Sequence, residues 1–305
     1  MKRIPIWIDC DTGVDDALAL LVACRLEQLQ IVGISTVSGN VHLDRSTENT
    51  LKVLELAGEA IPVYRGAEKP LYLPYEDASE FHGPDGLGGA ELPPAQSQPR
   101  ELPAWDALYE SAKAWGGELT VVTIGPMTNL ATALLRYPDL KGYIKQVAIM
   151  GGTTGKGNCT PYAEYNIYAD PHGAQVACAS GLPLVFCPLD VTHQAYLTGT
   201  DLEAIAAGGT AVGRFIRESS AHLLALNLKA GLPGIAQHDV CPILYLAEPA
   251  LFSGRGAAVR VETEDKLTMG KTHADFAAEE KNALILQHLD YPAFLQKVTE
   301  TLLSY

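Results

Sequence analysis

The chain of 305 residues contains 22 basic and 36 acidic residues, and its formal charge of −14 is unfavourable for sequence-independent nucleic-acid binding. Hydrophobic residues make up 47% of it, enough for the core of one large α/β domain. The six cysteines form no C-x-x-C pair, and we find no signal peptide and no apolar run long enough to cross a bilayer. We therefore expect a cytoplasmic protein with reduced thiols and no membrane contact.

Strand-like and helix-like segments alternate along the chain, which predicts a mostly parallel, Rossmann-like central sheet flanked by helices. We expect one domain over residues 1–305. A Pro-, Gly- and acid-rich segment at 66–104 is typical of a functional loop, and 229–238 is a shorter interruption. The predicted elements are strands at 4–10, 30–37, 119–124, 144–150 and 183–187, helices at 15–28, 43–57 and near 127–136, a late β-ribbon at 257–276 and a closing helix at 290–304.

Four carboxylates surround the junction between the first predicted strand and the first predicted helix, namely Asp9, Asp11, Asp15 and Asp16. They repel one another, so the cluster needs a cation, protons or hydrogen-bond donors. Acids that suit a helix dipole would explain only the last two. Ligands of such folds bind beyond the carboxyl ends of the strands, where three further segments also lie: Ser38-Gly39-Asn40, Gly125-Pro126 and Met150-Gly151-Gly152.

Asp11 and Asp16 are separated by a Gly-containing turn, a spacing that allows both carboxylates to bind one cation. Oxygen ligands suit Ca²⁺ or Mg²⁺ better than Zn²⁺. Asp239 precedes an apolar helical run and is the best candidate for a third, distant acid. The alternative for Asp239 is an ordinary helix N-cap.

Histidines and amides supply the other candidate groups. His238 could be a general acid, because histidine titrates near neutrality, or it could be structural. His82 lies in the long loop and could also be a surface turn residue. Asn158, Glu164 and Asn166 could bind several sugar hydroxyls, or they could satisfy their own backbone.

Taken together, these segments resemble the calcium-dependent nucleoside hydrolases of the inosine–uridine-preferring family. The resemblance covers most of the chain, and the N-terminal aspartate cluster is its most specific motif. The Gly and Asn pieces become specific only in combination. The matching segments, in chain order, are Asp9 to Asp16, Ser38-Gly39-Asn40, His82-Gly83, Gly125 to Leu130, Met150-Gly151-Gly152, Gly157 to Asn166, and His238-Asp239.

The resemblance implies hydrolysis of ribonucleosides to ribose and a free purine or pyrimidine base, by a homodimer or homotetramer. It implies that Asp11 binds Ca²⁺ and acts as general base on a metal-bound water, and that His238 helps to protonate the leaving base. Asp16, Asp239 and the Ile124 carbonyl would complete the metal ligands. The implied substrate-binding residues are Asp15, Asn40, His82, Met150, Asn158, Glu164 and Asn166, of which His82 lies in the loop that closes over the substrate.

Two positions depart from the family pattern. Thr12 replaces the usual proline after Asp11, and we expect the turn and the metal site to survive this change. Residues 219–227 contain no aromatic side chain, although pyrimidine-preferring members carry tyrosines there, so the base pocket is not defined. Two alternative functions remain: a haloacid-dehalogenase-like Mg²⁺-dependent phosphatase with Asp9 as nucleophile, or a non-catalytic nucleoside-binding protein.

Overall fold

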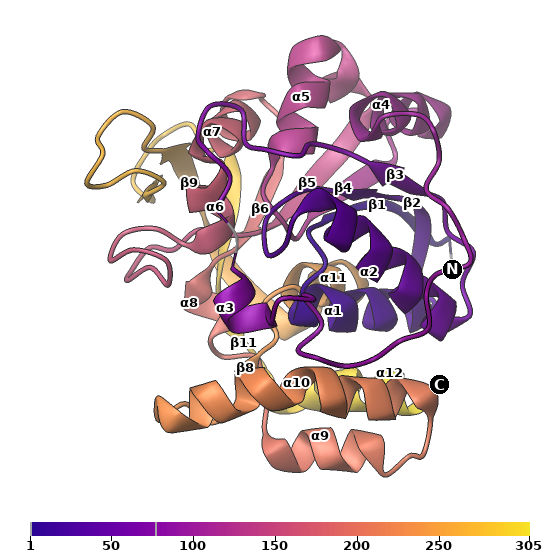
Figure 1. Cartoon of the computed structure of the whole chain (residues 1–305). Helices are drawn as coiled ribbons and strands as arrows, with labels where there is room; N and C mark the ends of the chain where they lie inside the picture. Colours follow the sequence, from indigo (N-terminus) through magenta and orange to yellow (C-terminus); the bar gives the residue numbers. More distant parts are fainter. Residues whose placement is uncertain (1, 77) are drawn as a thin grey trace.

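A nine-stranded sheet runs through the computed structural model, which describes residues 2–76 and 78–305 (Figure 1). The strand order is β10-β9-β11-β6-β5-β4-β1-β2-β3. Strands β1 to β6 and β11 pair in parallel, whereas β9 is antiparallel to both β10 and β11. The strands are β1 (Ile4–Cys10), β2 (Leu29–Thr36), β3 (Val63–Arg65), β4 (Leu119–Thr123), β5 (Ile144–Met150), β6 (Leu184–Cys187), β9 (Phe252–Val261), β10 (Thr272–Asp275) and β11 (Ala283–Leu289).

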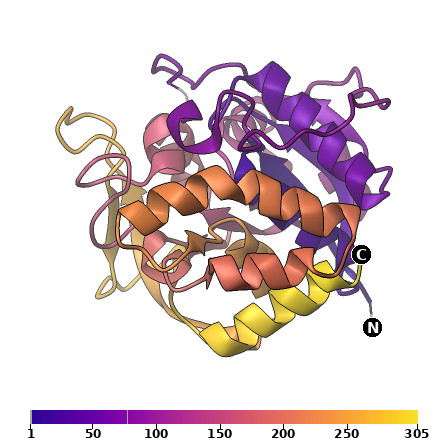
Figure 2. The same ribbon diagram turned by 60° about the horizontal axis from the view of Figure 1, so that its bottom comes forward.

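Helices cover both faces of the sheet, and a further layer of three helices lies below one of them (Figures 1 and 2). One face carries α1 (Val14–Arg25), α2 (Leu43–Ala57) and α11 (Val240–Ala247). The other carries α4 (Ala104–Trp115), α5 (Thr128–Arg136) and α7 (Pro171–Ala179). The outer layer consists of α9 (Gly199–Ala206), α10 (Ala211–Lys229) and α12 (Tyr291–Leu303). Short helices complete the fold: α3 (Ser79–His82), α6 (Tyr165–Ala169) and α8 (Leu189–Thr192).

Strand β1 shows why this sequence forms a central strand. Side chains alternate between the two faces of a strand, and both faces of β1 are buried. Ile6, Ile8 and Cys10 pack into the core beside α1 and α2, while Trp7 packs into the core beside α4 and α5. Continuous apolar character is therefore what this position requires.

The order of the strands places a switch point between β1 and β4. Connections from β1 proceed to β2 and β3 on one side, whereas β4 proceeds to β5 and β6 on the other. Loops at the carboxyl ends of β1 and β4 diverge there and leave a crevice, the usual ligand position in this architecture. The predicted α/β class and all eight predicted strands and helices of the first half of the fold are confirmed to within a few residues.

Two predicted details are corrected by the structure. The late ribbon begins at Phe252 rather than near 257, and β9 joins it to the main sheet through β11. The interruption at 229–238 contains β8 (Ile235–Ala236), which pairs antiparallel with β7 (Tyr196–Leu197). The long segment 66–104 forms one short helix, α3, and otherwise no regular helix or strand in its described part.

Candidate active site

Three carboxylates meet beneath the crevice. Asp15 and Asp16 come from the first turn of α1 and Asp239 from the residue before α11, and their carboxylate oxygens lie within 4.8 Å of one another. Asp16 and Asp239 are buried, while the side chain of Asp15 is 12% exposed and borders a cavity of about 850 Å³. Segments more than 200 residues apart thus build one acidic centre, as the sequence predicted for Asp16 and Asp239.

Asp11 lies directly beside Asp16, and backbone amides donate to both carboxylates. The backbone amide of Asn40 donates to Asp11 Oδ2 at 2.6 Å, and the Asn40 side chain donates to Asp16 Oδ2 at 3.0 Å. Asp16 also accepts from the backbone amides of Asp11 at 3.1 Å and Gly13 at 2.9 Å. One asparagine therefore fixes both acids, through its backbone amide and its side-chain amide.

Two glycines are needed for this packing around Asp11. A Cβ atom at Gly39 would lie 2.0 Å from Asp11 Oδ2, and one at Gly125 would lie 2.8 Å from Asp11 Oδ1. Gly39 follows β2 and Gly125 follows β4. The two segments that the sequence indicated after these strands therefore enclose the carboxylate of Asp11, which follows β1.

Burial makes these carboxylates costly to ionise. Desolvation, followed by the charge of Asp15, raises the pKa of Asp16 to about 7. Desolvation and the neighbouring acids raise the pKa of Asp11 and Asp239 well above the ordinary range. A cation at the centre would reverse this penalty, since an opposite charge favours the ionised form.

The donor set fits a hard divalent cation. Buried oxygens of Asp11 (Oδ1) and Asp15 (Oδ1) have no hydrogen-bond partner within the described part of the chain. The backbone carbonyl of Ile124 accepts from Asn166 Nδ2 at 2.9 Å, which leaves its second lone pair available. Carboxylate and carbonyl oxygens of this kind are ligands for Ca²⁺ or Mg²⁺.

The structure decides between alternatives that the sequence left open for Asp239, a helix N-cap or a site residue, and for Asp9, a possible nucleophile. Although Asp239 occupies the N-cap position of α11, its side chain makes no capping hydrogen bond, so the N-cap explanation is wrong. Asp9 is buried on the α5 side, where Ser35 and Asn129 donate to its Oδ1 at 2.6 and 2.8 Å. It does not line the cavity and is not placed to attack a ligand there.

The expected sugar-binding residues line one wall of the cavity, together with Met150 from β5. Glu164 caps α6, accepting from the backbone amides of Asn166, Gly152 and Ile167 at 2.8, 3.0 and 3.1 Å, and burial raises its pKa to about 7. Asn158 accepts from the backbone of Tyr165 at 3.0 Å. Glu164 and Asn158 therefore both bind the backbone and line the cavity. Hydrogen bonding to the backbone does not exclude a role in binding sugar hydroxyls.

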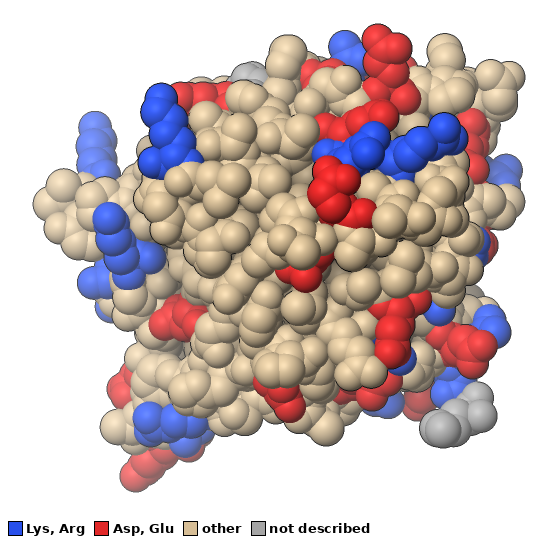
Figure 3. Space-filling model, turned by 90° about the horizontal axis from the view of Figure 1, so that it is seen from below, with Lys and Arg blue, Asp and Glu red and all other residues tan. Residues whose placement is uncertain are grey.

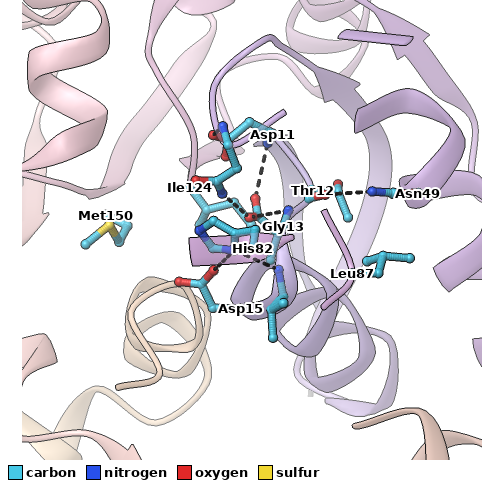
Figure 4. Close-up of polar contacts among 12 residues, drawn as sticks. Asp11, Thr12, Gly13, Asp15, Asn49, His82, Leu87, Ile124 and Met150 are labelled. Atoms are coloured by element: carbon cyan, nitrogen blue, oxygen red, sulfur yellow. Dashed lines mark hydrogen bonds and ion pairs between the residues drawn. The ribbon is translucent and has the colours of Figure 1, made fainter. Parts of the chain in front are cut away.

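His82 connects the long loop to the acidic centre. Its Nδ1 accepts a hydrogen bond from the backbone amide of Val14 at 3.2 Å and lies 3.9 Å from Asp15 Oδ1 (Figure 4). Burial lowers its pKa, although the charge of Asp15 partly opposes this. The loop is thus docked on the N-terminus of α1, so the surface-turn explanation for His82 is wrong.

Thr12 shows why the departure from proline is tolerated. Its hydroxyl forms a hydrogen bond with Thr50 Oγ1 at 2.7 Å, and its carbonyl accepts from Asn49 Nδ2 at 3.2 Å (Figure 4). Side-chain contacts with α2 hold the turn that a proline ring would stiffen. Helix α1 accordingly starts at Val14, with Gly13 at the N-cap position.

Sequence reasoning missed most of the far end of the cavity, beyond His238. His193 and Tyr196 line it, with Leu223 and Asn227 from α10. His193 packs edge-on against His238, with ring centroids 5.6 Å apart. Residues 193–196 follow β6, and ligands in this architecture bind beyond the carboxyl ends of the strands, so this signal could have predicted them. His193 and Tyr196 thus add aromatic rings to the cavity, whereas α10 contributes Leu223 and Asn227.

Comparisons with known proteins agree with this architecture. A family model described as inosine-uridine preferring nucleoside hydrolase matches residues 6–296. Non-specific ribonucleoside hydrolase RihC of Escherichia coli is 37% identical over 303 residues, 98% of each chain. Among solved structures, the plant nucleoside hydrolase PpNRh1 has a TM-score of 0.95 at 29% identity over 100% of both chains. The purine-preferring ribonucleoside hydrolase of Gardnerella vaginalis has a TM-score of 0.94 at 29% identity over 98% of both.

Fold and site define an α/β enzyme with an acidic, oxygen-rich centre at the sheet's switch point. The chain belongs to the inosine-uridine preferring nucleoside hydrolase family, whose members are metal-dependent. It is a hydrolase that cleaves the N-glycosidic bond of nucleosides to give ribose and a free base. The phosphatase and the non-catalytic binding protein are not favoured.

Proposed function

We propose that Asp11, Asp16, Asp239 and the Ile124 carbonyl hold a Ca²⁺ ion. The observation that carries this proposal is the buried acidic centre at the cavity floor, with unpartnered oxygens on Asp11 and Asp15. Ca²⁺ accepts six to eight oxygen ligands in flexible geometry, whereas Mg²⁺ demands a near-ideal octahedron. A centre in which several carboxylates crowd one point fits the larger ion better.

Asp11 is the proposed general base. When bound, the cation would orient and acidify the water that attacks the anomeric carbon. Asp11 Oδ1 has no other partner, so it is free to accept the proton of that water. The remaining acids favour an oxocarbenium-like ribosyl transition state electrostatically, because positive charge develops on the sugar.

The wall residues would hold the ribose, which orients the anomeric carbon toward the acidic centre. Asp15 and Asp239 both line the cavity, and we assign Asp15, which is not among the proposed metal ligands, to the sugar hydroxyls. The other proposed sugar contacts are Asn40, Met150, Asn158, Glu164 and Asn166. For Asn40 this requires its amide to turn from Asp16 or to serve both groups.

His238 and His82 would serve the base end of the substrate. His238 lines the cavity, and we propose that it stabilises the departing base by donating from its ring. His82 would lie over the bound substrate, at the point where the long loop meets α1. The relatives named above are called non-specific and purine-preferring, so we propose ribonucleosides as the substrate class without assigning a base.

The substrate proposal is tested by measuring reducing-sugar release from ribonucleosides, 2′-deoxynucleosides and ribonucleoside 5′-phosphates in parallel. We expect release from ribonucleosides, and much less from deoxynucleosides because the 2′-hydroxyl contacts are lost. Equal release from both sugars would contradict the assignment of Asp15 and its neighbours to the ribose hydroxyls.

We further propose a cytoplasmic homodimer or homotetramer. The structure shows all six cysteines as free thiols, which supports a reducing compartment. None of the helices in the described residues is long and apolar enough to cross a bilayer. Sedimentation velocity on the purified protein tests the oligomeric state, and a monomer at micromolar concentration would contradict it.

A further inference from the structure

Thr192 forms a hydrogen bond with the ring of His238 from behind the cavity. Its Oγ1 lies 2.8 Å from His238 Nδ1, and the residue is fully buried at the end of α8. His238 lines the cavity, whereas Thr192 does not. The hydroxyl therefore touches the catalytic candidate and not the substrate.

Burial indicates the direction of this hydrogen bond. Within the described part of the chain, Thr192 Oγ1 has no hydrogen-bond partner other than His238 Nδ1. If the hydroxyl accepted a proton from Nδ1, its own hydrogen would be buried without an acceptor, which is costly. The hydroxyl is satisfied when it donates to Nδ1, and the ring then carries its proton on Nε2.

The surrounding backbone holds the two partners in place. The amide of Thr192 donates to Pro188 O at 3.0 Å within α8, and the amide of Gln237 donates to Ala195 O at 2.7 Å beside the β7–β8 pair. The segments that carry Thr192 and His238 are thereby joined. His193 also packs edge-on against the His238 imidazole.

We infer that Thr192 is a positioning residue, which holds His238 with Nε2–H available to the leaving base of the nucleoside. With Nδ1 engaged, Nε2 is the one ring nitrogen left for the substrate, and as a donor it stabilises the negative charge that builds on the base. No bond to Thr192 forms or breaks in this role. The inference rests on the role proposed above for His238.

The test compares Thr192→Val, which removes the hydroxyl, with Thr192→Ser, which keeps it. Substrates are uridine, inosine and p-nitrophenyl riboside, whose leaving group needs little help. We expect Thr192→Val to lower kcat/KM for both nucleosides about 10-fold, the value of one hydrogen bond, and to change p-nitrophenyl riboside cleavage by less than about 2-fold. Thr192→Ser should restore most of the nucleoside activity.

Two results would overturn the inference. One is an equal loss on all three substrates with no rescue by serine, which indicates a structural role. The other is unchanged nucleoside cleavage by Thr192→Val. A parallel His238→Ala variant separates this inference from the proposed function. If it lowers kcat/KM equally for nucleosides and p-nitrophenyl riboside, the proposed role of His238 itself is wrong. In the His238→Ala background, Thr192→Val should leave the ratio of nucleoside to p-nitrophenyl riboside rates unchanged.

Discussion

At the scale of single residues, Asp11 illustrates what a sequence can and cannot reveal. Its position after a buried strand and before an acid-rich turn was sufficient to predict a site. The short contact from the Asn40 amide and the unpartnered Oδ1 of Asp11 depend on β1 and β2 being neighbours in the sheet. No local sequence pattern predicts that pairing. The chemical type of the site was thus predictable, while its hydrogen bonding was not.

Replacing Asp11 by asparagine tests its role as base. We expect Asp11→Asn to lower kcat by at least about 10²–10⁴-fold, because the amide cannot accept the proton. Folding should be retained, and the melting temperature should stay the same or rise without calcium, since burial opposes the charge of Asp11. Ribose release and thermal unfolding measure the two effects. An active variant that still binds calcium would exclude Asp11 as the base.

Replacing His238 tests the group at the leaving base. His238→Ala should slow cleavage of uridine and inosine far more than cleavage of p-nitrophenyl riboside, because nitrophenolate leaves readily without a donor. We expect about 10²-fold or more on the nucleosides, in line with general acid–base contributions. Equal losses on all substrates would indicate that His238 serves binding or structure alone.

At the scale of elements, the buried parallel strands were predictable because both their faces require apolar residues. Strand β1 and helix α2 have the expected bounds, Ile4–Cys10 and Leu43–Ala57. The start of the ribbon was misplaced because the residues after Phe252 are exposed, and buried side chains alternate with more exposed ones only from Ala257 onward. The pairing of β7 with β8 joins two-residue strands about 40 residues apart, and such short strands carry no periodic signal.

The turn after β2 offers a test of close packing at the carboxylate. Gly39→Ala places a methyl group 2.0 Å from the present position of Asp11 Oδ2, so the carboxylate or the turn must move. We expect a loss of activity of about 10²-fold, the usual effect of displacing a catalytic group by an ångström. Gly142→Ala is the matched control, because a Cβ there meets nothing within 4 Å. Similar activity of both variants would show that the Asp11 geometry is not critical.

At the scale of the whole molecule, the sequence predicted the crevice because the strand ends of a parallel sheet converge. The part of the cavity beside His238 was not predictable, since it is lined by His193, the β7–β8 pair and α10, which come together only in the folded chain. The charged side chains of one face are interspersed, although the net charge of the chain is −14. On the face around α9, α10 and α12, basic side chains are scattered among acids and form no broad patch (Figure 3).

The buried acids predict a pH dependence for the cation-free protein. The pKa values of Asp9, Asp16 and Glu164 are raised to about 7, mainly by desolvation. Between their ordinary values and about 7, the folded protein holds more protons than the unfolded chain, so stability falls as pH rises through this range. In chelator, the melting temperature should fall from about pH 5 to pH 8, and saturating Ca²⁺ should reduce this fall. A melting temperature that rises over the same range without Ca²⁺ would contradict the prediction.

The central claim is a calcium-dependent ribonucleoside hydrolase, and ribose release from uridine and inosine with and without a calcium chelator tests it most directly. We predict that the chelator abolishes release and that excess Ca²⁺ restores it. Calcium at 100 times its dissociation constant should also stabilise the fold by about 2.7 kcal/mol. Release that continues unchanged after complete removal of divalent cations, with the protein folded, would contradict the account.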